Sequence, residues 1–236
     1  MEDQIILIDK PAGISSFGCV SKVRGRLKAE FGHKVKVGHT GTLDPFATGL
    51  LILLSGKMTK KSNEFLKKDK EYIATMKLGF TSTTGDPEGE ISPYPSERPP
   101  EPGKARMSAP RPWRRAEATQ PELDTVESTI QSFVGEIEQT PPRFSAIKIN
   151  GERAYKLARK DVDFEIPSRK VTIYDIEILD YNYPELTVRC FVSSGTYIRT
   201  LAEDIGKALG TGAYLTSLRR TKIADFKVED AEKLEL

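Results

Sequence analysis

The apolar run LLILL, residues 50–54, constrains the fold more than any other stretch of the chain. Gly49 and Gly56 bound it, and its five residues have the length of a buried strand, whereas a membrane-spanning helix needs about 20. The N-terminal stretch MEDQIILIDKP has no basic region followed by an apolar segment and a cleavage site, so no export signal is predicted. We therefore expect a globular protein of the cytoplasm, with strands in its core and no membrane contact.

The spacing of apolar residues changes between helix and strand periods along the chain, without a regular alternation of the two. Strands are predicted at 5–9, 50–54, 71–80, 143–149, 171–179 and 186–192, the last two as a pair, with extended chain at 214–226. Helices are predicted from Ser15 or Ser16 to Phe31 and at 59–66, 122–135, 151–160 and 196–209. This pattern predicts a mixed α+β fold.

Length and composition indicate one domain with a hydrophilic insertion. A chain of 236 residues, 38% hydrophobic and 30% charged, can build one substantial core. Residues 92–121 are rich in proline and arginine and hold too few apolar groups to offset their ordering entropy. We interpret them as a flexible insertion within the domain. Its arginines are expected in a solvated linker, with contact to nucleic acid as the alternative: Arg98, Arg106, Arg111, Arg114 and Arg115.

Basic residues gather between positions 22 and 36, although the net charge is only +2. The cluster consists of Lys22, Arg24, Arg26, Lys28, Lys34 and Lys36. It fits either a site for a phosphate backbone or the solvated face of a helix, and charge alone leaves both open. Cys19 and Cys190 are too few for a disulfide framework or a metal cluster, which suits a reducing compartment.

The segment GHTGTLDPFATG, residues 38–49, carries a single acid, Asp44. Asp followed by Pro45 is also typical of a helix start, but glycines on both sides favour an exposed acid on a loop that lets backbone approach a ligand. One carboxylate cannot perform two-carboxylate acid–base work unless Asp86 or Glu90 approaches through the fold. Covalent attack is the remaining use, with a nearby cation to keep the acid ionised. No metal is expected, because His39 has too few potential co-ligands nearby.

Three further residues each allow a functional and a structural interpretation. Arg199, near the start of a predicted helix, either pairs with a functional carboxylate or forms a surface pair with Glu203. Tyr72 is either a core residue or a ring that stacks on a planar base. His39 is either a turn histidine bonded to backbone or a ring that stacks on or wedges into nucleic acid.

Six segments of the chain occur in the order found in the TruB family of pseudouridine synthases, which the chain resembles. They are KPAGISSFGCVSKVR (10–24), GHTGTLDPFATGLL (38–51), EYIATMKLGFTSTTGDPEG (71–89), QTPPRFSAIKINGERAYKLAR (139–159), SSGTYIRTLAEDIG (193–206) and LRRT (218–221). The resemblance implies the pseudouridine synthase fold, a mixed, largely antiparallel sheet flanked by helices, with a central RNA-binding cleft. It also implies an RNA-clasping thumb at about 139–160, and the chain length leaves no room for a C-terminal PUA domain.

The same resemblance assigns roles to six positions. It implies a catalytic acid at Asp44, a base-contacting tyrosine at Tyr72, an acid-pairing arginine at Arg199, a pocket residue at Leu218, a nucleotide-displacing histidine at His39 and a further acid at Asp86. The expected reaction is isomerisation of the T-loop uridine (position 55) of tRNA to pseudouridine. This reaction requires base flipping and one ionised carboxylate, and it requires no cofactor. We expect the protein to bind the T arm of its tRNA substrate, to use no guide RNA and to be a monomer.

The sequence also allows two other functions. An RNA-binding chaperone that folds tRNA, with secondary or lost catalysis, would not require Asp44. A glycosidase would release free base and leave an abasic product.

Overall fold

The computed structural model describes residues 2–94, 120–145, 147–149, 151–160 and 163–234. Most of the expected insertion at 92–121 lies outside these residues. The strands are β1 (Ile5–Lys10), β2 (Val37–His39), β3 (Thr48–Ser55), β4 (Lys70–Leu78), β5 (Phe80–Ser82), β6 (Ile91–Pro93), β7 (Gly135–Gln139), β8 (Lys148–Ile149), β9 (Glu152–Arg153), β10 (Arg169–Asn182), β11 (Glu185–Val192), β12 (Ala213–Ile223), β13 (Phe226–Lys227) and β14 (Glu232–Lys233). The α-helices are α1 (Ser16–Phe31), α2 (Ser62–Leu66), α3 (Leu123–Gln131), α4 (Ala154–Arg159) and α5 (Ile198–Ala208), with 3-10 turns at Gly56–Lys61 and Val228–Asp230.

One large sheet organises the described residues. Its strand order is β14-β1-β3-β12-β4-β11-β10-β7, with β2 added to β3 and β13 to β12. The pairs β1–β14 and β3–β12 are parallel and the other pairs antiparallel, which confirms the predicted mixed, largely antiparallel α+β fold. Across the described ranges no helix is long and apolar enough to cross a membrane.

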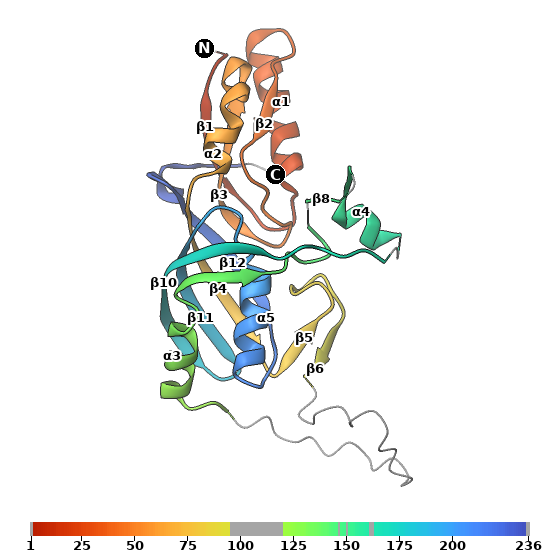
Figure 1. Cartoon of the computed structure of the whole chain (residues 1–236). Helices are drawn as coiled ribbons and strands as arrows, with labels where there is room; N and C mark the ends of the chain where they lie inside the picture. Colours follow the sequence, from red (N-terminus) through yellow and green to blue (C-terminus); the bar gives the residue numbers. More distant parts are fainter. Residues whose placement is uncertain (1, 95–119, 146, 150, 161–162, 235–236) are drawn as a thin grey trace.

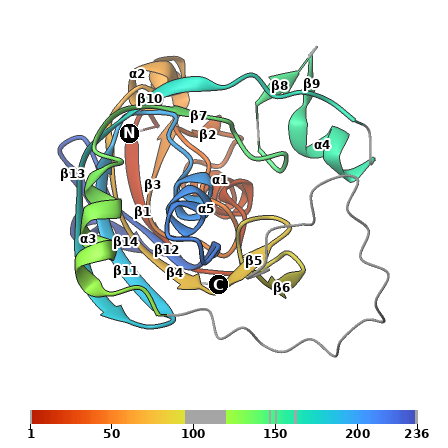
Figure 2. The same ribbon diagram turned by 60° about the horizontal axis from the view of Figure 1, so that its bottom comes forward.

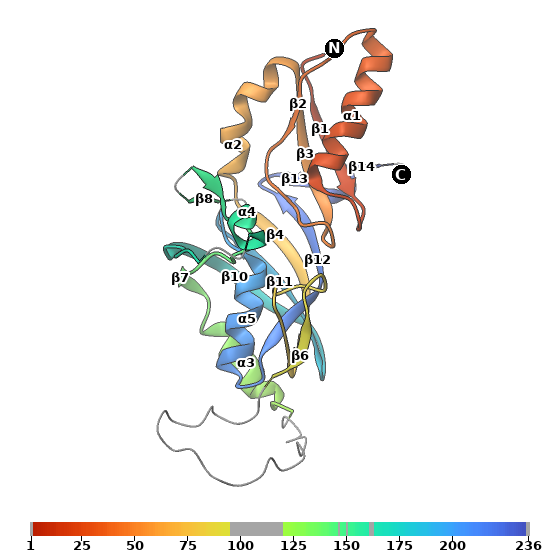
Figure 3. The same ribbon diagram turned by 90° about the vertical axis from the view of Figure 1, so that its right-hand side faces the viewer.

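The LLILL run lies in β3, between two separate hydrophobic clusters. Leu51 and Leu53 pack with the apolar face of α1, whereas Leu50, Ile52 and Leu54 pack on the opposite side of the sheet with Phe65 of α2. Figure 3 shows α1 and α2 on opposite sides of β1 and β3. A strand buried on both faces must be apolar at every position, which explains the unbroken run.

Helix α1 has the boundaries that the sequence predicts. The Ser15 side chain caps its N-terminus by accepting a hydrogen bond from Gly18 N at 3.0 Å. Gly32 ends it with a left-handed backbone conformation, φ 75°. The second serine, Ser16, has another use, described below.

The second half of the sheet forms the largest cluster. The alternation of β4 buries Tyr72, Ala74 and Met76 on one face, against residues of β11, β12, α3 and α5. Figure 3 shows α5 and α3 along this half of the sheet. Strands β10 and β11 pair as predicted, from Ile173–Val192 to Asn182–Glu185. Helix α5 packs against the same cluster, and Tyr197 before its first turn is hydrogen-bonded to Gln139 at the end of β7.

Several boundaries differ from the sequence-based predictions. The strand expected at 71–80 breaks at Gly79, whose φ of 84° separates β4 from β5. The strand expected at 143–149 is wrong for most of its length, since only Lys148–Ile149 is strand. The helix expected at 151–160 begins at Ala154, because the two residues before it pair with β8. The helix expected at 59–66 starts as a 3-10 turn.

Strands β8 and β9 and helix α4 form a small unit. Two views of the molecule show it standing beside the large sheet rather than within it (Figures 1 and 2). It connects to the sheet through the segment that follows β7.

Candidate active site

Asp44 lies in a loop between β2 and β3, not at a helix start. The residues on either side of it are anchored. The Ser16 hydroxyl accepts from Leu43 N at 2.8 Å and donates to Leu43 O at 2.9 Å. Lys10 Nζ donates to Pro45 O at 3.1 Å. The loop therefore holds the Asp44 side chain, which is 33% exposed, between two fixed backbone positions.

Arg220 of β12 holds the two ends of the same loop. The residue is 1% exposed, and its guanidinium donates to Leu50 O at 2.8 Å and to Gly41 O at 3.2 Å. Burial of a cation is costly unless hydrogen-bond acceptors replace its hydration, and these two carbonyl groups do so for Arg220. Neither Arg220 nor Lys10 stands out in the sequence as a site residue, although both lie in the segments that resemble the family, because burial of a charge depends on the tertiary fold.

Arg199, in the first turn of α5, is paired with Asp44. Its Nε lies 3.1 Å from Asp44 Oδ2, and its side chain is only 5% exposed. The alternative of a surface pair with Glu203 is therefore wrong. The other end of the guanidinium donates to Thr84 O and Phe144 O, each at 2.9 Å. These bonds fix its plane and direct Nε at the carboxylate.

Asp86 completes a line of three charges. Its Oδ2 lies 3.2 Å from Arg199 Nη1, and its Oδ1 accepts from Thr84 Oγ1 at 2.5 Å and from Glu88 N at 3.0 Å. Two carboxylates thus share one buried guanidinium. Glu90, the other acid considered from the sequence, is exposed.

The electrostatic environment of Asp44 is mixed. Burial raises the pKa of Asp44 above its ordinary value, and the nearby carboxylate of Asp86 acts in the same direction. Arg199 opposes this rise most strongly, with smaller contributions from Lys10 and Arg220. The expected effect of a cation on the acid is present, but burial outweighs it.

Tyr72 and Leu218 border the loop from neighbouring strands. Both belong to the cluster that includes Leu43, and they are 7% and 6% exposed. The Tyr72 side chain is hydrogen-bonded with Arg220, and burial raises the pKa of Tyr72. The free protein thus places the Tyr72 ring in the core, close to Asp44. Stacking of this ring on a base stays a prediction.

His39 ends β2 and is half-buried. Its Nδ1 is buried and has no hydrogen-bond partner among the residues that the structure describes. Burial lowers the pKa of His39, and Arg220 and Arg153 lower it further, so the ring is neutral at neutral pH. The interpretation as a histidine held by backbone through this nitrogen is not supported.

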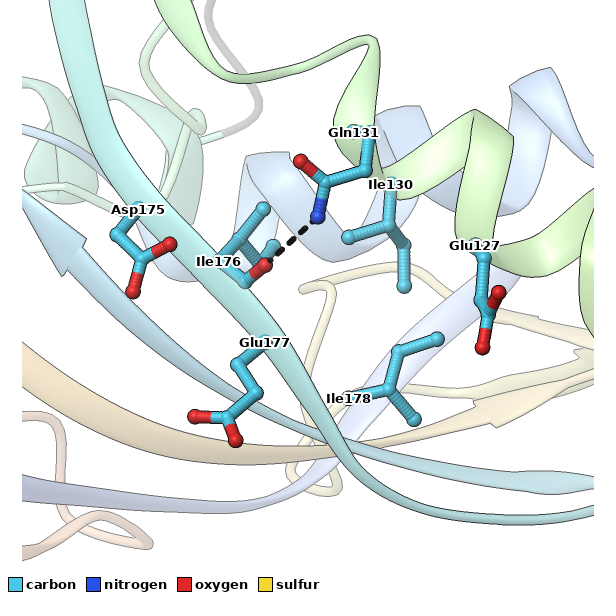
Figure 4. Close-up of a pocket in the computed structure, with 7 residues that line it drawn as sticks. All are labelled: Glu127, Ile130, Gln131, Asp175, Ile176, Glu177 and Ile178. Carbon is cyan, nitrogen blue, oxygen red and sulfur yellow. Dashed lines mark hydrogen bonds between the residues drawn. The ribbon is translucent and has the colours of Figure 1, made fainter.

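No group of three or more His, Cys, Asp or Glu side chains in the described ranges could hold a metal ion. A groove of about 440 Å³ lies elsewhere, between α3 and β10 (Figure 4). Glu127, Asp175 and Glu177 line it, so its charge would repel a phosphate backbone. We assign no RNA contact to it.

Comparison with known proteins finds matches over most of the chain. The description "TruB family pseudouridylate synthase (N terminal domain)" matches residues 27–109 and 103–198, and "tRNA pseudouridylate synthase B C-terminal domain" matches residues 199–236. The chain is 44% identical to a tRNA pseudouridine synthase B of Phocaeicola vulgatus, over 99% of this chain and 91% of the relative. It is 44% identical to the same-named protein of Desulfotalea psychrophila, over 98% of this chain and 88% of the relative.

Solved structures show the same fold. A chain in the crystal structure of a Cbf5-Nop10-Gar1 complex superposes with a TM-score of 0.67 at 29% identity, over 99% of this chain. A chain in the structure of an H/ACA RNP bound to a substrate RNA containing 2'-deoxyuridine superposes with a TM-score of 0.62 at 26% identity, over 98% of this chain. The present chain spans 52% and 51% of those two chains, about half of each.

Proposed function

The chain belongs to the TruB family of pseudouridylate synthases, and we propose that it isomerises the T-loop uridine at position 55 of tRNA to pseudouridine. Relatives named tRNA pseudouridine synthase B, identical at 44% of positions over nearly the whole chain, support tRNA as the substrate. Residues 1–236 act as one catalytic unit in this proposal. Strand β12, from the C-terminal matched region, lies in the same sheet as β3 and β4 from the N-terminal one, which supports this view.

The observation that carries the proposal is the Asp44–Arg199 pair on a loop anchored at Gly41, Leu43 and Pro45. Pseudouridine formation breaks the N1–C1′ bond of the nucleotide, turns the uracil ring and forms a C5–C1′ bond. The proton lost from C5 is balanced by one gained at N1. Asp44 acts in this reaction by attack on C6, by attack on C1′, or by removal of a sugar proton, and each route requires one ionised carboxylate. Arg199 favours that ionised form.

The remaining predicted residues act around the target nucleotide. Tyr72 contacts the uracil ring and Leu218 lines its apolar pocket. His39 is neutral, and its Nδ1 has no hydrogen-bond partner in the described part of the chain; it takes part in displacing the nucleotide from its stack. Asp86 shares Arg199 with Asp44 and thereby sets how strongly the arginine acts on the catalytic acid.

The RNA lies, in this proposal, in a cleft bordered by the Asp44 loop and the unit β8–α4, which clasps the T arm. The exposed lysines of the basic cluster, Lys28, Lys34 and Lys36, extend the contact to phosphates. Arg26 is already paired with Glu232 at 2.6 Å, and Arg24 donates to Val37 O, so these two serve the fold. The protein acts as a cytoplasmic monomer, without guide RNA or cofactor.

The test is incubation of the purified protein with an unmodified tRNA transcript, followed by mapping of pseudouridine. A matched transcript with cytidine at position 55 is the control. The proposal is supported if pseudouridine forms at position 55 of the unmodified transcript and the cytidine control forms none. An abasic product would identify a glycosidase, and tight binding without product would identify an RNA chaperone.

A further inference from the structure

Gln139, the last residue of β7, makes a closed pair of hydrogen bonds with the start of α5. Its side chain is almost fully buried, at 1% exposed. Its Oε1 accepts from Tyr197 N at 2.8 Å, and its Nε2 donates to Tyr197 O at 3.0 Å. Tyr197 directly precedes α5, and no side chain at that position caps the helix. The amide of Gln139 therefore fixes the backbone from which the helix begins.

Two more contacts join the same segments. Thr200 Oγ1 donates to Thr140 O at 3.4 Å, and Arg199 Nη2 donates to Phe144 O at 2.9 Å. The first turn of α5 thus holds residues 139–144, which lead from β7 toward β8 and α4. Figure 2 shows β7 at the edge of the sheet and the β8–α4 unit beyond it.

We propose that Gln139 is a positioning residue for pseudouridine formation, which acts by fixing the first turn of α5 so that Arg199 Nε meets Asp44 Oδ2. This inference rests on the proposed function. Arg199 lies two residues after Tyr197, and its Nε is 3.1 Å from the carboxylate, so a small rotation or shift of the helix start removes the pairing. The segment proposed to clasp RNA is anchored on the same helical turn as the cation.

The charges that face Asp44 come from several elements. They are Arg199 of α5, Asp86 and Glu88 from the turn after β5, Lys10 of β1, Tyr72 of β4 and Arg220 of β12. Only Arg199 is attached to the turn that Gln139 holds. Loss of the Gln139 bonds therefore weakens one favourable influence on ionised Asp44 and leaves the others in place.

Gln139→Met removes both hydrogen bonds at nearly constant side-chain volume. We expect the single-turnover rate to fall by about 10- to 100-fold, because a misplacement of about 1 Å can have an effect of that size. The rate should be measured from about pH 5 to about pH 9, and the acid limb of this profile should move to higher pH. The Kd for tRNA should stay within about threefold of the wild-type value. A residue with a purely structural role would change stability without moving the acid limb.

Gln131→Met is the matched control. Gln131 also donates its side-chain amide to a backbone carbonyl, Ile176 O at 3.2 Å, but in the groove between α3 and β10 (Figure 4). The rate and the acid limb of the Gln131→Met variant should match those of the wild type. Gln139→Glu keeps the acceptor for Tyr197 N and should fall between the wild type and Gln139→Met.

The outcomes separate the two levels of the proposal. A wild-type protein that forms no pseudouridine overturns the proposed function and this inference with it. An active wild type whose Gln139→Met variant behaves like Gln131→Met overturns the inference alone. If Gln139→Met does not fold, Gln139→Glu decides: a rate lowered by about three- to tenfold with a shifted acid limb supports the inference, and a wild-type profile overturns it.

Discussion

Replacement of Arg199 by methionine tests the ion pair at the centre of the site. The change removes the cation shared by Asp44 and Asp86 but keeps a long apolar side chain in a position that is 4% exposed. The variant should bind tRNA and fail to modify it at a useful rate.

The magnitude follows from the geometry. Two unit charges 3.1 Å apart attract by about 5 kcal/mol at an effective dielectric constant of about 20. Because the Asp44 side chain is 33% exposed, solvent screens part of this attraction, and we take about 2 to 3 kcal/mol. That energy corresponds to a rate lowered by about 30- to 150-fold. The pKa of Asp44, already raised by burial, rises further, so the loss should be greatest at low pH.

The assay is single-turnover pseudouridine formation on an unmodified tRNA transcript, together with tRNA binding measured separately. The Kd should change by less than about threefold, because the Arg199 guanidinium is committed to protein acceptors. Arg189→Met is the control, since Arg189 pairs with Glu177 at the surface, where such pairs contribute about 0 to 1 kcal/mol. If Arg199→Met is as fast as Arg189→Met, or loses binding and turnover equally, Arg199 does not act through its pairing with Asp44.

Three further predictions follow from buried groups. Gly49→Ala should lower the free energy of unfolding by about 3 kcal/mol in chemical denaturation, because φ is 100° and the added Cβ would overlap the Arg220 backbone. In the control Gly38→Ala the added Cβ meets no neighbour, and the free energy of unfolding should change by less than about 1 kcal/mol. Burial raises the pKa of Cys190 to about 12, so iodoacetamide at neutral pH should label it only after unfolding, as read by mass spectrometry; labelling of the native protein would contradict this. Burial lowers the pKa of Lys70 from 10.5 to about 8, so between these two pH values the unfolded chain binds more protons than the folded protein. The free energy of unfolding should therefore rise with pH over this range, relative to that of Lys70→Met. Parallel curves of unfolding free energy against pH for the two proteins would be evidence against it.

Local sequence signals predicted much of the fold. The serine cap and the spacing of Val20, Val23 and Leu27 placed α1 correctly, and the unbroken LLILL run placed β3 in the interior. Alternation predicted the β10–β11 pair. These features are set by short-range periodicity, which a single sequence contains.

The errors arose where tertiary contacts override local pattern. Residues 143–149 have the composition of a strand, but Phe144 O is held by Arg199, and only the last two residues find a strand partner. Gly79 breaks an otherwise continuous strand because its positive φ turns the chain.

The same reason limits prediction of the site. Asp44, its glycines and its expected partner Arg199 lie in recognisable segments, and the structure brings them together with Asp86. The roles of Lys10, Ser16 and Arg220 depend on their bonds to Pro45 O, Leu43 O and Gly41 O, which lie 27 to 179 residues away in the chain. Such long-range burial of polar groups leaves no periodic signal in the sequence.

Asp44→Asn tests whether the Asp44 carboxylate performs the chemistry. Asparagine has the shape of aspartate but cannot act as an ionised nucleophile or base. In single-turnover reactions with unmodified tRNA, we predict pseudouridine formation at least about 1,000-fold slower than in the wild type, with Kd within about threefold. Asp9→Asn, which alters a partly buried aspartate paired with Arg219 at 2.9 Å, should stay within a few fold of the wild type. Pseudouridine formed by Asp44→Asn at a rate near that of Asp9→Asn would contradict the account.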